Sequence, residues 1–285
     1  MTTAATSSPS LIESERVRVT QAAPGYLTVT LDNPPYNLFD PAVFAGLHLL
    51  QQYVDDPANG VKVFVLETAN PEFFIAHLQF STMAEVPDIP GAQPLIENWP
   101  VFSHWLATTS AVSIAKVRGR ARGIGNELIV ACDLRYASAE TARLGQIEVG
   151  FGMAPGGGGS EWLPRHVGRS RALEIILSAE DYDALTAERY GWVTRAVPDA
   201  ELDAYVDRLA RRIAGFSSES IATTKQAVNA RQAPPAREEL ADSFATILRL
   251  AGTDSAKQTV QRLYAKAGGD LGGWEHNLPD LYATD

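Results

Sequence analysis

The stretch GRARGIGNELIVACDLRYASAETARLGQIEVGFGMAPGGGGSEWLPR, residues 119–165, decides the fold and draws attention to two acidic residues. Glu127 follows Gly123 and Gly125, and Glu148 comes shortly before the four glycines 156–159. Glycine permits backbone angles that other residues avoid and lets another group approach the main chain closely. Two carboxyls among such residues, in otherwise apolar sequence, indicate a site where a ligand contacts backbone and acid together.

The composition of the 285-residue chain is that of a soluble globular enzyme, with 45% hydrophobic and 20% charged residues. Its net charge of −10 argues against a nucleic-acid binder, whose surface is basic. The single cysteine, Cys132, excludes a disulfide or a thiolate metal cluster within one chain. It lies in the apolar run LIVACDL, which predicts a buried, unreactive thiol.

Nothing in the sequence predicts a membrane segment, because no span approaches the roughly 20 apolar residues that a membrane helix needs. The N-terminal MTTAATSSPSLIESE does not have the basic and apolar regions of a signal peptide. We therefore expect a cytoplasmic protein that contacts neither membrane nor nucleic acid. The expected organisation is a disordered tail over 1–10, a core domain over 11–198 and a helical region over 199–285.

The first half of the chain predicts alternating strands and helices. Alternation of apolar and polar residues over 17–32, around Pro24-Gly25, is typical of a β-hairpin. An Asp cap, a Pro at the first helical position and a one-sided apolar pattern predict a helix over 40–56. Short apolar runs predict the rest: strands over 61–68, 110–119 and 134–138, and a helix over 126–131.

The second half is mostly helical, so the whole predicts a layered α/β fold. Amphipathic patterns predict helices over 169–180, 183–193 and 199–216. Residues 217–270 predict three more helices, broken at Pro234-Pro235 and Gly252. We interpret the glycine-rich segment AGGDLGGWEHNLPD near the end as an irregular tail.

Several collinear motifs resemble the enoyl-CoA hydratase/isomerase (crotonase) superfamily over about residues 17–265. The family pattern V-N-G-x-A-x-G-G-G-x-E-L is similar to Val117–Leu128, and A-C-D matches 131–133. F-G-x-P-E resembles Leu144–Glu148, and P-G-x-G-G-x-x-x-L resembles Pro155–Leu163. Weaker similarities are F-C-A-G-A-D to residues 74–79, L-N-x-P-x-x-x-N-A to the segment from Leu31, and A-x-x-x-G-L-V to the end of 183–193.

The resemblance implies a spiral of ββα repeats, in two nearly perpendicular sheets, with C-terminal helices that form a homotrimer or homohexamer. It also implies an acyl-CoA substrate, with coenzyme A arriving on the substrate and no separate cofactor. The backbone N–H groups of Leu78 and Ile124 are the implied oxyanion hole, which stabilises negative charge on the thioester oxygen. Glu127 and Glu148 are the implied acid/base pair. The implied substrate-contacting residues are Ala76, His77, Gly123, Gly125, Pro155 and Gly156.

Two nearby carboxyls in a partly dry site suit water addition to a double bond. One takes a proton from water and the other delivers a proton to Cα. Their mutual repulsion raises one pKa, which provides an acid and a base together at neutral pH. The leading hypothesis is therefore an enoyl-CoA hydratase-type lyase. The alternatives are an isomerase or C–C bond hydrolase of the same superfamily, and a catalytically silent CoA-binding protein.

The sequence departs from the family pattern at the predicted oxyanion hole. Ile124 replaces a glycine, so a positive φ there would be strained. Ala76-His77-Leu78-Gln79 replaces A-G-A-D, and Ile147 replaces the Pro before the second glutamate. Bulkier Leu78 and Ile124 predict a reshaped acyl site whose substrate is not a simple fatty enoyl-CoA.

The remaining polar residues have ordinary interpretations. We expect His77 to be partly buried and hydrogen-bonded to main chain, and His104 to pack on an amphipathic helix. Arg118, Arg120 and Arg122 alternate, which favours a solvated or subunit-facing stripe, with CoA phosphate binding as the alternative. Lys266 resembles a weakly matched basic residue that contacts the CoA of a neighbouring subunit. No His/carboxylate spacing predicts a metal site.

Overall fold

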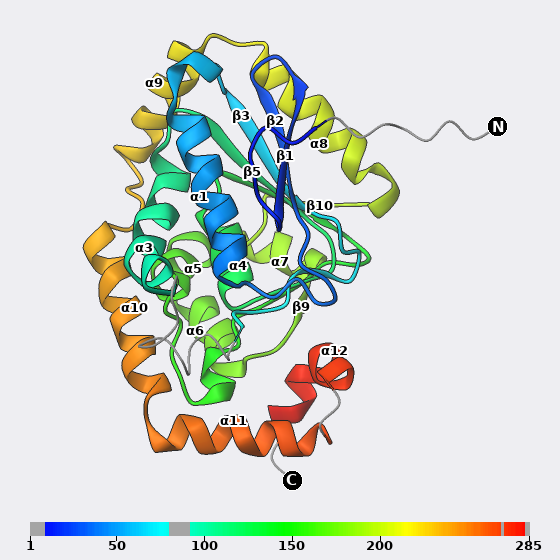
Figure 1. The fold of residues 1–285 in the computed structure, drawn as a ribbon, viewed down its shortest axis with the longest axis vertical. Helices are drawn as coiled ribbons and strands as arrows, with labels where there is room; N and C mark the ends of the chain where they lie inside the picture. Colours follow the sequence, from blue (N-terminus) through cyan, green and yellow to red (C-terminus); the bar gives the residue numbers. More distant parts are fainter. Residues whose placement is uncertain (1–8, 80–91, 269–270, 283–285) are drawn as a thin grey trace, which may run out of the picture.

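The computed structural model describes residues 9–79, 92–268 and 271–282, and within them the strands form two sheets. The larger sheet has six strands in the order β1-β2-β3-β5-β7-β10, and the smaller has four in the order β4-β6-β8-β9. Helices lie on both sides of the larger sheet (Figure 1). The predicted α/β class is confirmed. Among the described residues no helix is both long and apolar enough to cross a membrane.

The larger sheet begins with the predicted hairpin. β1 (Val17–Ala23) pairs antiparallel with β2 (Tyr26–Leu31), and Gly25 in the turn has a φ of 73°. From β2 onward neighbouring strands are parallel: β3 (Val63–Thr68), β5 (Val112–Val117), β7 (Leu134–Ser138) and β10 (Arg195–Val197). Because both faces of a parallel sheet are covered, its strands are apolar runs, as in the buried first four residues of β3.

The smaller sheet brings the motif segments to one edge. β4 (Phe73–Ile75), β6 (Arg120–Arg122) and β8 (Arg143–Gly145) are parallel neighbours, and β9 (Tyr182–Asp183) pairs antiparallel with β8. The residues that follow these parallel strands, 76–78, 123–124 and 146–148, therefore emerge together at the carboxyl edge. Ligands bind at that edge in many α/β proteins.

Helices before residue 190 enclose the core on one side of the larger sheet. α1 (Pro41–Asp55) begins as predicted, with the Asp40 carboxylate accepting the Val43 N–H at 2.8 Å. Its five predicted apolar residues are all buried: Val43, Phe44, Leu47, Leu50 and Val54. The other elements are η1 (Pro57–Asn59), α3 (Ala92–Thr108), α4 (Ile124–Ala131), η2 (Glu148–Phe151), α5 (Gly159–Val167), α6 (Arg169–Ser178) and α7 (Ala184–Tyr190).

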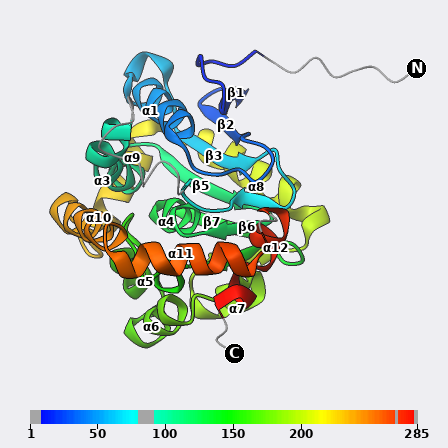
Figure 2. The same cartoon turned by 60° about the horizontal axis from the view of Figure 1, so that its bottom comes forward.

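The C-terminal part of the chain is helical and covers both the sheet and the site edge. α8 (Asp199–Ala214) buries Leu202 and Val206 against the second face of the larger sheet. The three helices expected over 217–270 are α9 (Ser218–Asn229), α10 (Arg237–Ala251) and α11 (Asp254–Lys266). Figure 2 shows α11 crossing in front of α4 and α5.

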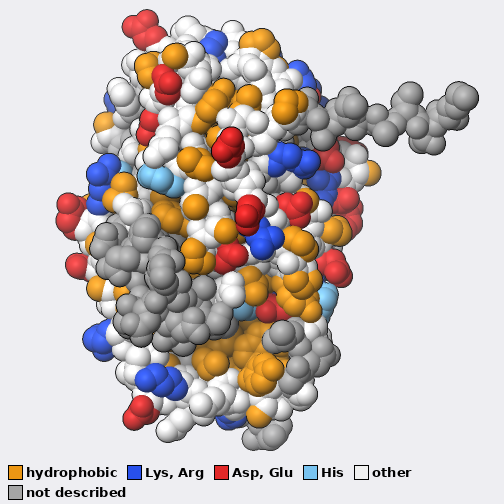
Figure 3. Space-filling view, viewed as in Figure 1, with side chains coloured by type: hydrophobic (Ala, Val, Ile, Leu, Met, Phe, Trp, Pro, Cys, Tyr) orange, Lys and Arg blue, Asp and Glu red, His pale blue; other side chains and the backbone are white. Residues whose placement is uncertain are grey.

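The prediction of an irregular tail was wrong, because residues 271–282 form the helix α12 (Leu271–Tyr282), kinked at Asn277. Trp274 and Leu278 are buried there in a cluster with Phe151, Ile247 and Leu263. Tertiary burial of this apolar face outweighs the low helix propensity of the local glycines and proline. Hydrophobic side chains also gather on the surface above α11 (Figure 3).

The predicted basic stripe was also wrong. Arg118 lies outside β6, before the bend at Gly119, and binds Asp199 and Asp203 at 2.8 and 2.9 Å. Arg122 is fully buried and donates two hydrogen bonds to Asp181, at 2.7 and 2.5 Å. The bend breaks the strand alternation on which the prediction depended.

Candidate active site

Glu127 lies in the first turn of α4, and the glycine run 156–159 surrounds its carboxyl group. The carboxylate oxygen Oε1 accepts the main-chain N–H groups of Gly157 at 2.8 Å and Gly159 at 3.0 Å. A Cβ at Gly157 would stand 2.2 Å from Glu127 Oε2. The run therefore has no side chain where the carboxyl lies, and its amides favour the charged form of that carboxyl.

Glu148 is the first residue of η2 and is also buried, at 7% exposure. Its Oε2 accepts a hydrogen bond of 2.8 Å from the Gln146 side-chain amide. Its Oε1 lies against Gly123, where a Cβ would come within 2.7 Å. Gly123 has a φ of 52°, so both its conformation and its close contact require glycine.

The fold brings the two carboxyls into one buried cluster. Gly123 contacts Glu148 and also accepts the Glu127 N–H at 2.9 Å through its carbonyl oxygen. On the other side, the Gln146 amide that binds Glu148 packs against Gly159, whose N–H binds Glu127. Both acids therefore contact the same small set of residues, Gly123, Gln146 and Gly159, which fixes the two carboxyls relative to each other.

Burial is the main cause of the raised pKa values of Glu127 and Glu148. Burial, and then the charge of Glu148, raises the pKa of Glu127 well above its ordinary value of 4.5, against the opposing amides of Gly159 and Gly157. Burial likewise raises the pKa of Glu148 to about 7, against the opposing hydrogen bond from Gln146. Since each ionised carboxyl disfavours ionisation of the other, one member of the pair is favoured as the acid while the other is the base.

The two predicted oxyanion donors lie at the same sheet edge. Ile124 is the first residue of α4, so its N–H has no intrahelical partner. Phe39 pairs with the residues on either side of Leu78: its N–H donates to the His77 carbonyl at 2.8 Å, and its carbonyl accepts the Gln79 N–H at 3.0 Å. The Leu78 N–H therefore points away from Phe39.

Replacement of the family glycine by Ile124 causes no backbone strain. Within the described part of the chain, the non-glycine residues with positive φ are Asn37 and Ala179. The left-handed conformation falls on Gly123 instead. Gly125 provides the close approach between α4 and β4, because a Cβ there would stand 2.6 Å from the Ile75 carbonyl oxygen.

The other predicted contact residues also occupy this region. Ala76 and Pro155 are buried, and a Cβ on Gly156 would collide with Ile247 of α10 at 2.1 Å. His77 is buried, and its Nδ1 contacts the Leu78 carbonyl oxygen at 2.6 Å, as expected for a histidine bonded to main chain. Its other nitrogen, Nε2, lies 2.9 Å from Glu275 of α12, a partner that the sequence did not predict.

Comparison with known proteins identifies the family. The model of the enoyl-CoA hydratase/isomerase family matches residues 22–266. The chain belongs to this family. A probable enoyl-CoA hydratase of Mycobacterium tuberculosis is 36% identical over 177 residues, 61% of this chain and 65% of its own length. The 2,3-dehydroadipyl-CoA hydratase of Escherichia coli is 32% identical over 206 residues, 72% of this chain and 79% of its own length.

Solved structures of the enoyl-CoA hydratase/isomerase family confirm the predicted crotonase fold. A putative enoyl-CoA hydratase from Streptomyces avermitilis superposes with a TM-score of 0.84 at 37% identity, covering 96% of this chain and 98% of its own. The alignments to the first five curated relatives span 58% to 65% of those relatives' lengths.

Sequence reasoning missed the polar chain behind Glu148 in this family member. The Trp192 indole N–H donates to Asn126 at 2.8 Å, and the Asn126 amide donates to Gln146 at 2.7 Å. Gln146 in turn donates to Glu148. The available signal was Gln146 itself, at the variable position of the F-G-x-P-E motif. Nothing local indicated Trp192, because the contact joins residues 66 positions apart.

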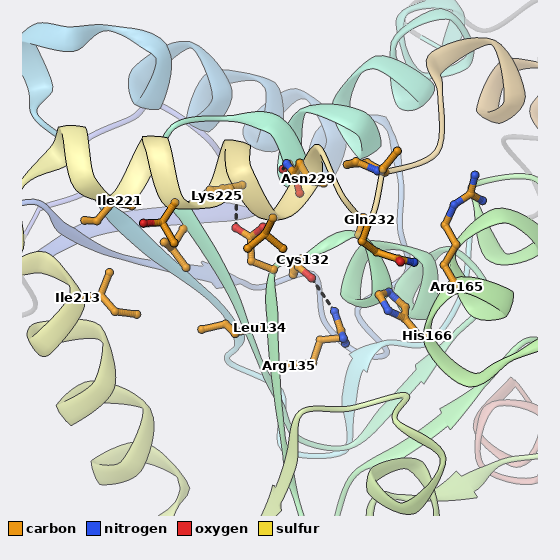
Figure 4. A pocket seen from close by; sticks show the side chains of 18 of the residues that line it. Cys132, Leu134, Arg135, Arg165, His166, Ile213, Ile221, Lys225, Asn229 and Gln232 are labelled. Carbon is orange, nitrogen blue, oxygen red and sulfur yellow. Dashed lines mark hydrogen bonds and ion pairs between the residues drawn. The ribbon is translucent and has the colours of Figure 1, made fainter.

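A cavity of about 620 Å³ lies elsewhere, between α9 and the C-terminal ends of α4 and α5 (Figure 4). Lys225 pairs there with Asp133 at 2.6 Å, and His166 contacts the Val130 carbonyl oxygen at 2.9 Å. Cys132 lines this cavity but is buried as predicted, and burial raises the pKa of its thiol to about 12, which disfavours the reactive thiolate. Neither catalytic candidate lines the cavity, so we do not assign it to the reaction.

Two further predicted residues lie away from the carboxyl pair. His104 of α3 is half-buried, and its Nδ1 contacts the Pro235 carbonyl oxygen at 2.9 Å. Lys266 is exposed at the end of α11. Its predicted contact with the CoA of a neighbouring subunit stays a prediction.

Proposed function

We propose that the protein catalyses reversible addition of water to an enoyl-CoA thioester, with Glu127 and Glu148 as the acid/base pair. The observation that carries this proposal is the buried pair of carboxyls beside main-chain N–H groups, with burial raising the pKa of both. Membership of the enoyl-CoA hydratase/isomerase family supports it.

The chemistry requires an acid and a base at once. One carboxylate takes a proton from water as the water oxygen bonds to Cβ, and the other carboxyl gives its proton to Cα. The pair begins and ends the addition with one proton, moved from one carboxyl to the other. A pair whose members share that proton at pH 7 needs no outside acid or base during the addition.

The thioester oxygen becomes negative between the two proton transfers. The N–H groups of Leu78 and Ile124 would bind it, and the start of α4 would add the positive end of the helix dipole. Both donors belong to the main chain, so the branched side chain of Ile124 is compatible with the role. No redox group takes part, and coenzyme A arrives with the substrate.

Hydration of a panel of enoyl-CoA thioesters tests the proposal. We expect loss of the conjugated-thioester absorbance and appearance of a 3-hydroxyacyl-CoA, measured for crotonyl-CoA and for longer and branched substrates. An isomerase would instead move the double bond and yield no hydroxyacyl product. Failure to hydrate any member of the panel would contradict the proposal.

A further inference from the structure

One residue of the C-terminal helix contacts both segments that carry the predicted oxyanion donors. The Glu275 carboxylate lies 2.9 Å from His77 Nε2, and the Glu275 carbonyl oxygen accepts a hydrogen bond of 2.6 Å from Arg122. His77 directly precedes Leu78, and Arg122 directly precedes the Gly123-Ile124 pair. The two donor segments, 198 and 153 residues away in sequence, therefore meet at one position of α12.

The His77 ring connects Glu275 to the backbone of the first donor. A trans peptide places its N–H and C=O on opposite sides, so the bond from Phe39 to the His77 carbonyl directs the Leu78 N–H the other way. On the next peptide, His77 Nδ1 contacts the Leu78 carbonyl oxygen at 2.6 Å. A fixed His77 ring therefore restrains the Leu78–Gln79 peptide, which directly follows the Leu78 N–H.

The hydrogen-bond partners determine where hydrogens lie on this pair. A carbonyl oxygen only accepts, so Nδ1 must carry a hydrogen toward Leu78. Between Nε2 and the Glu275 carboxyl another hydrogen is needed, since two lone pairs facing each other at 2.9 Å would repel. The contact is therefore a directional hydrogen bond between the imidazole ring and the carboxyl.

The burial of this pair is costly for a purely structural contact. The side chains of His77 and Glu275 are 5% and 4% exposed. Glu275 Oε2 is buried without a hydrogen-bond partner in the described part of the chain. An unsatisfied buried carboxyl oxygen is destabilising, and such exceptions concentrate at functional sites.

We infer that Glu275 is a positioning residue: its side chain holds the Leu78 donor in place through His77, and its main-chain carbonyl oxygen binds Arg122 beside the Ile124 donor. α12 is then part of the active site of its own chain. This inference rests on the proposed function, because both concern the same reaction. Glu275 itself has no contact with reacting atoms in this scheme.

The same helix supplies a matched control. His276, the next residue, lies 3.4 Å from Glu72, and these side chains are 36% and 63% exposed. Glu72→Ala removes a His–Glu pair from the outer side of α12 and leaves the buried pair intact. Its hydration rate is expected to stay within about twofold of the wild type, since exposed ion pairs contribute little.

Steady-state hydration kinetics give the first test. In Glu275→Ala, kcat should fall about tenfold to a hundredfold with KM changed less than about threefold, because the donors act mainly on the transition state. Glu275→Gln should retain kcat within about threefold, since its amide can donate to His77 Nε2. The double variant His77→Ala/Glu275→Ala should be no slower than the slower single variant, because both residues act through one path.

Hydrogen exchange without substrate gives a second test that does not depend on the reaction. In Glu275→Ala the amides of Phe39 and Gln79, which bracket Leu78, should exchange about tenfold faster, while those of β3 keep their wild-type rates. Glu72→Ala should leave both regions unchanged. If the wild type hydrates no enoyl-CoA, the proposed function fails. The hydrogen-exchange rates of Phe39 and Gln79 still test whether Glu275 restrains the backbone around Leu78.

Three results would overturn the positioning role. They are an unchanged kcat in Glu275→Ala, a kcat in Glu275→Gln as low as that in Glu275→Ala, and unchanged exchange at Phe39 and Gln79 in Glu275→Ala.

Discussion

Replacing Glu148 by glutamine should make the protein more stable at alkaline pH while it removes activity. The carboxyl is buried, and burial raises its pKa from 4.5 to about 7. Between these pH values the folded protein binds more protons than the unfolded chain does. Folding stability therefore falls as pH rises through this window, and the neutral amide of Glu148→Gln does not suffer that loss.

The size of the effect follows from the two pKa values. A difference of about 2.5 pH units, from 4.5 to about 7, corresponds to about 3 kcal/mol at about 1.4 kcal/mol per unit. The gain of the variant over wild type should approach about 3 kcal/mol at pH 8 and stay under about 1 kcal/mol at pH 5. Loss of the Glu148 charge also lowers the pKa of Glu127, which further increases the stability gain of the variant at alkaline pH.

Urea denaturation at pH 5 and pH 8, at one protein concentration, measures this difference. Any pH-independent effect of the substitution cancels between the two conditions. Glu15→Gln is the matched control, because Glu15 is exposed ahead of β1. The gain is the free energy of unfolding of the variant minus that of the wild type. A gain at pH 8 that equals the gain at pH 5, or is smaller than it, would refute the reasoning.

The same geometry makes four further predictions. Gly157→Ala places a Cβ 2.2 Å from Glu127 Oε2 and should lower kcat at least about tenfold in the hydration assay. Ile124→Ala should keep kcat within about tenfold in that assay, because the donor is a main-chain N–H. Asp181→Ala leaves the buried Arg122 without its carboxylate and should cost about 3 kcal/mol in urea denaturation. In a pH–rate profile, kcat/KM should fall as pH rises through about 7, where the Glu148 carboxyl loses its proton.

Much of the fold could be predicted from sequence, because the signals were local. The Asp40 cap and the buried face of α1 appear where their residues predict them, and β7 has the predicted bounds. The motifs also indicated Glu127 and Glu148, because glycines crowd around both. Strand order was not predictable in the same way, since parallel pairing joins segments far apart in the chain.

The parts of the site that were missed depend on long-range contacts. α12 contains two adjacent glycines and a proline, so its helix arises from burying Trp274 and Leu278, which local propensity does not indicate. The predicted stripe of three arginines assumed one continuous strand, whereas the chain bends at Gly119. A Cβ at Gly119 would stand 2.2 Å from the Glu72 backbone, a contact between distant segments.

Incorporation of oxygen from water tests the central claim most directly. Wild type, Glu127→Gln and Glu148→Gln are incubated with the best enoyl-CoA of the panel in ¹⁸O-labelled water, and the product is analysed by mass spectrometry. We predict a 3-hydroxyacyl-CoA labelled at C3 in the wild type, formed at least about a hundredfold more slowly by each variant. Labelling at the wild-type rate in both variants would contradict the carboxyl-pair mechanism.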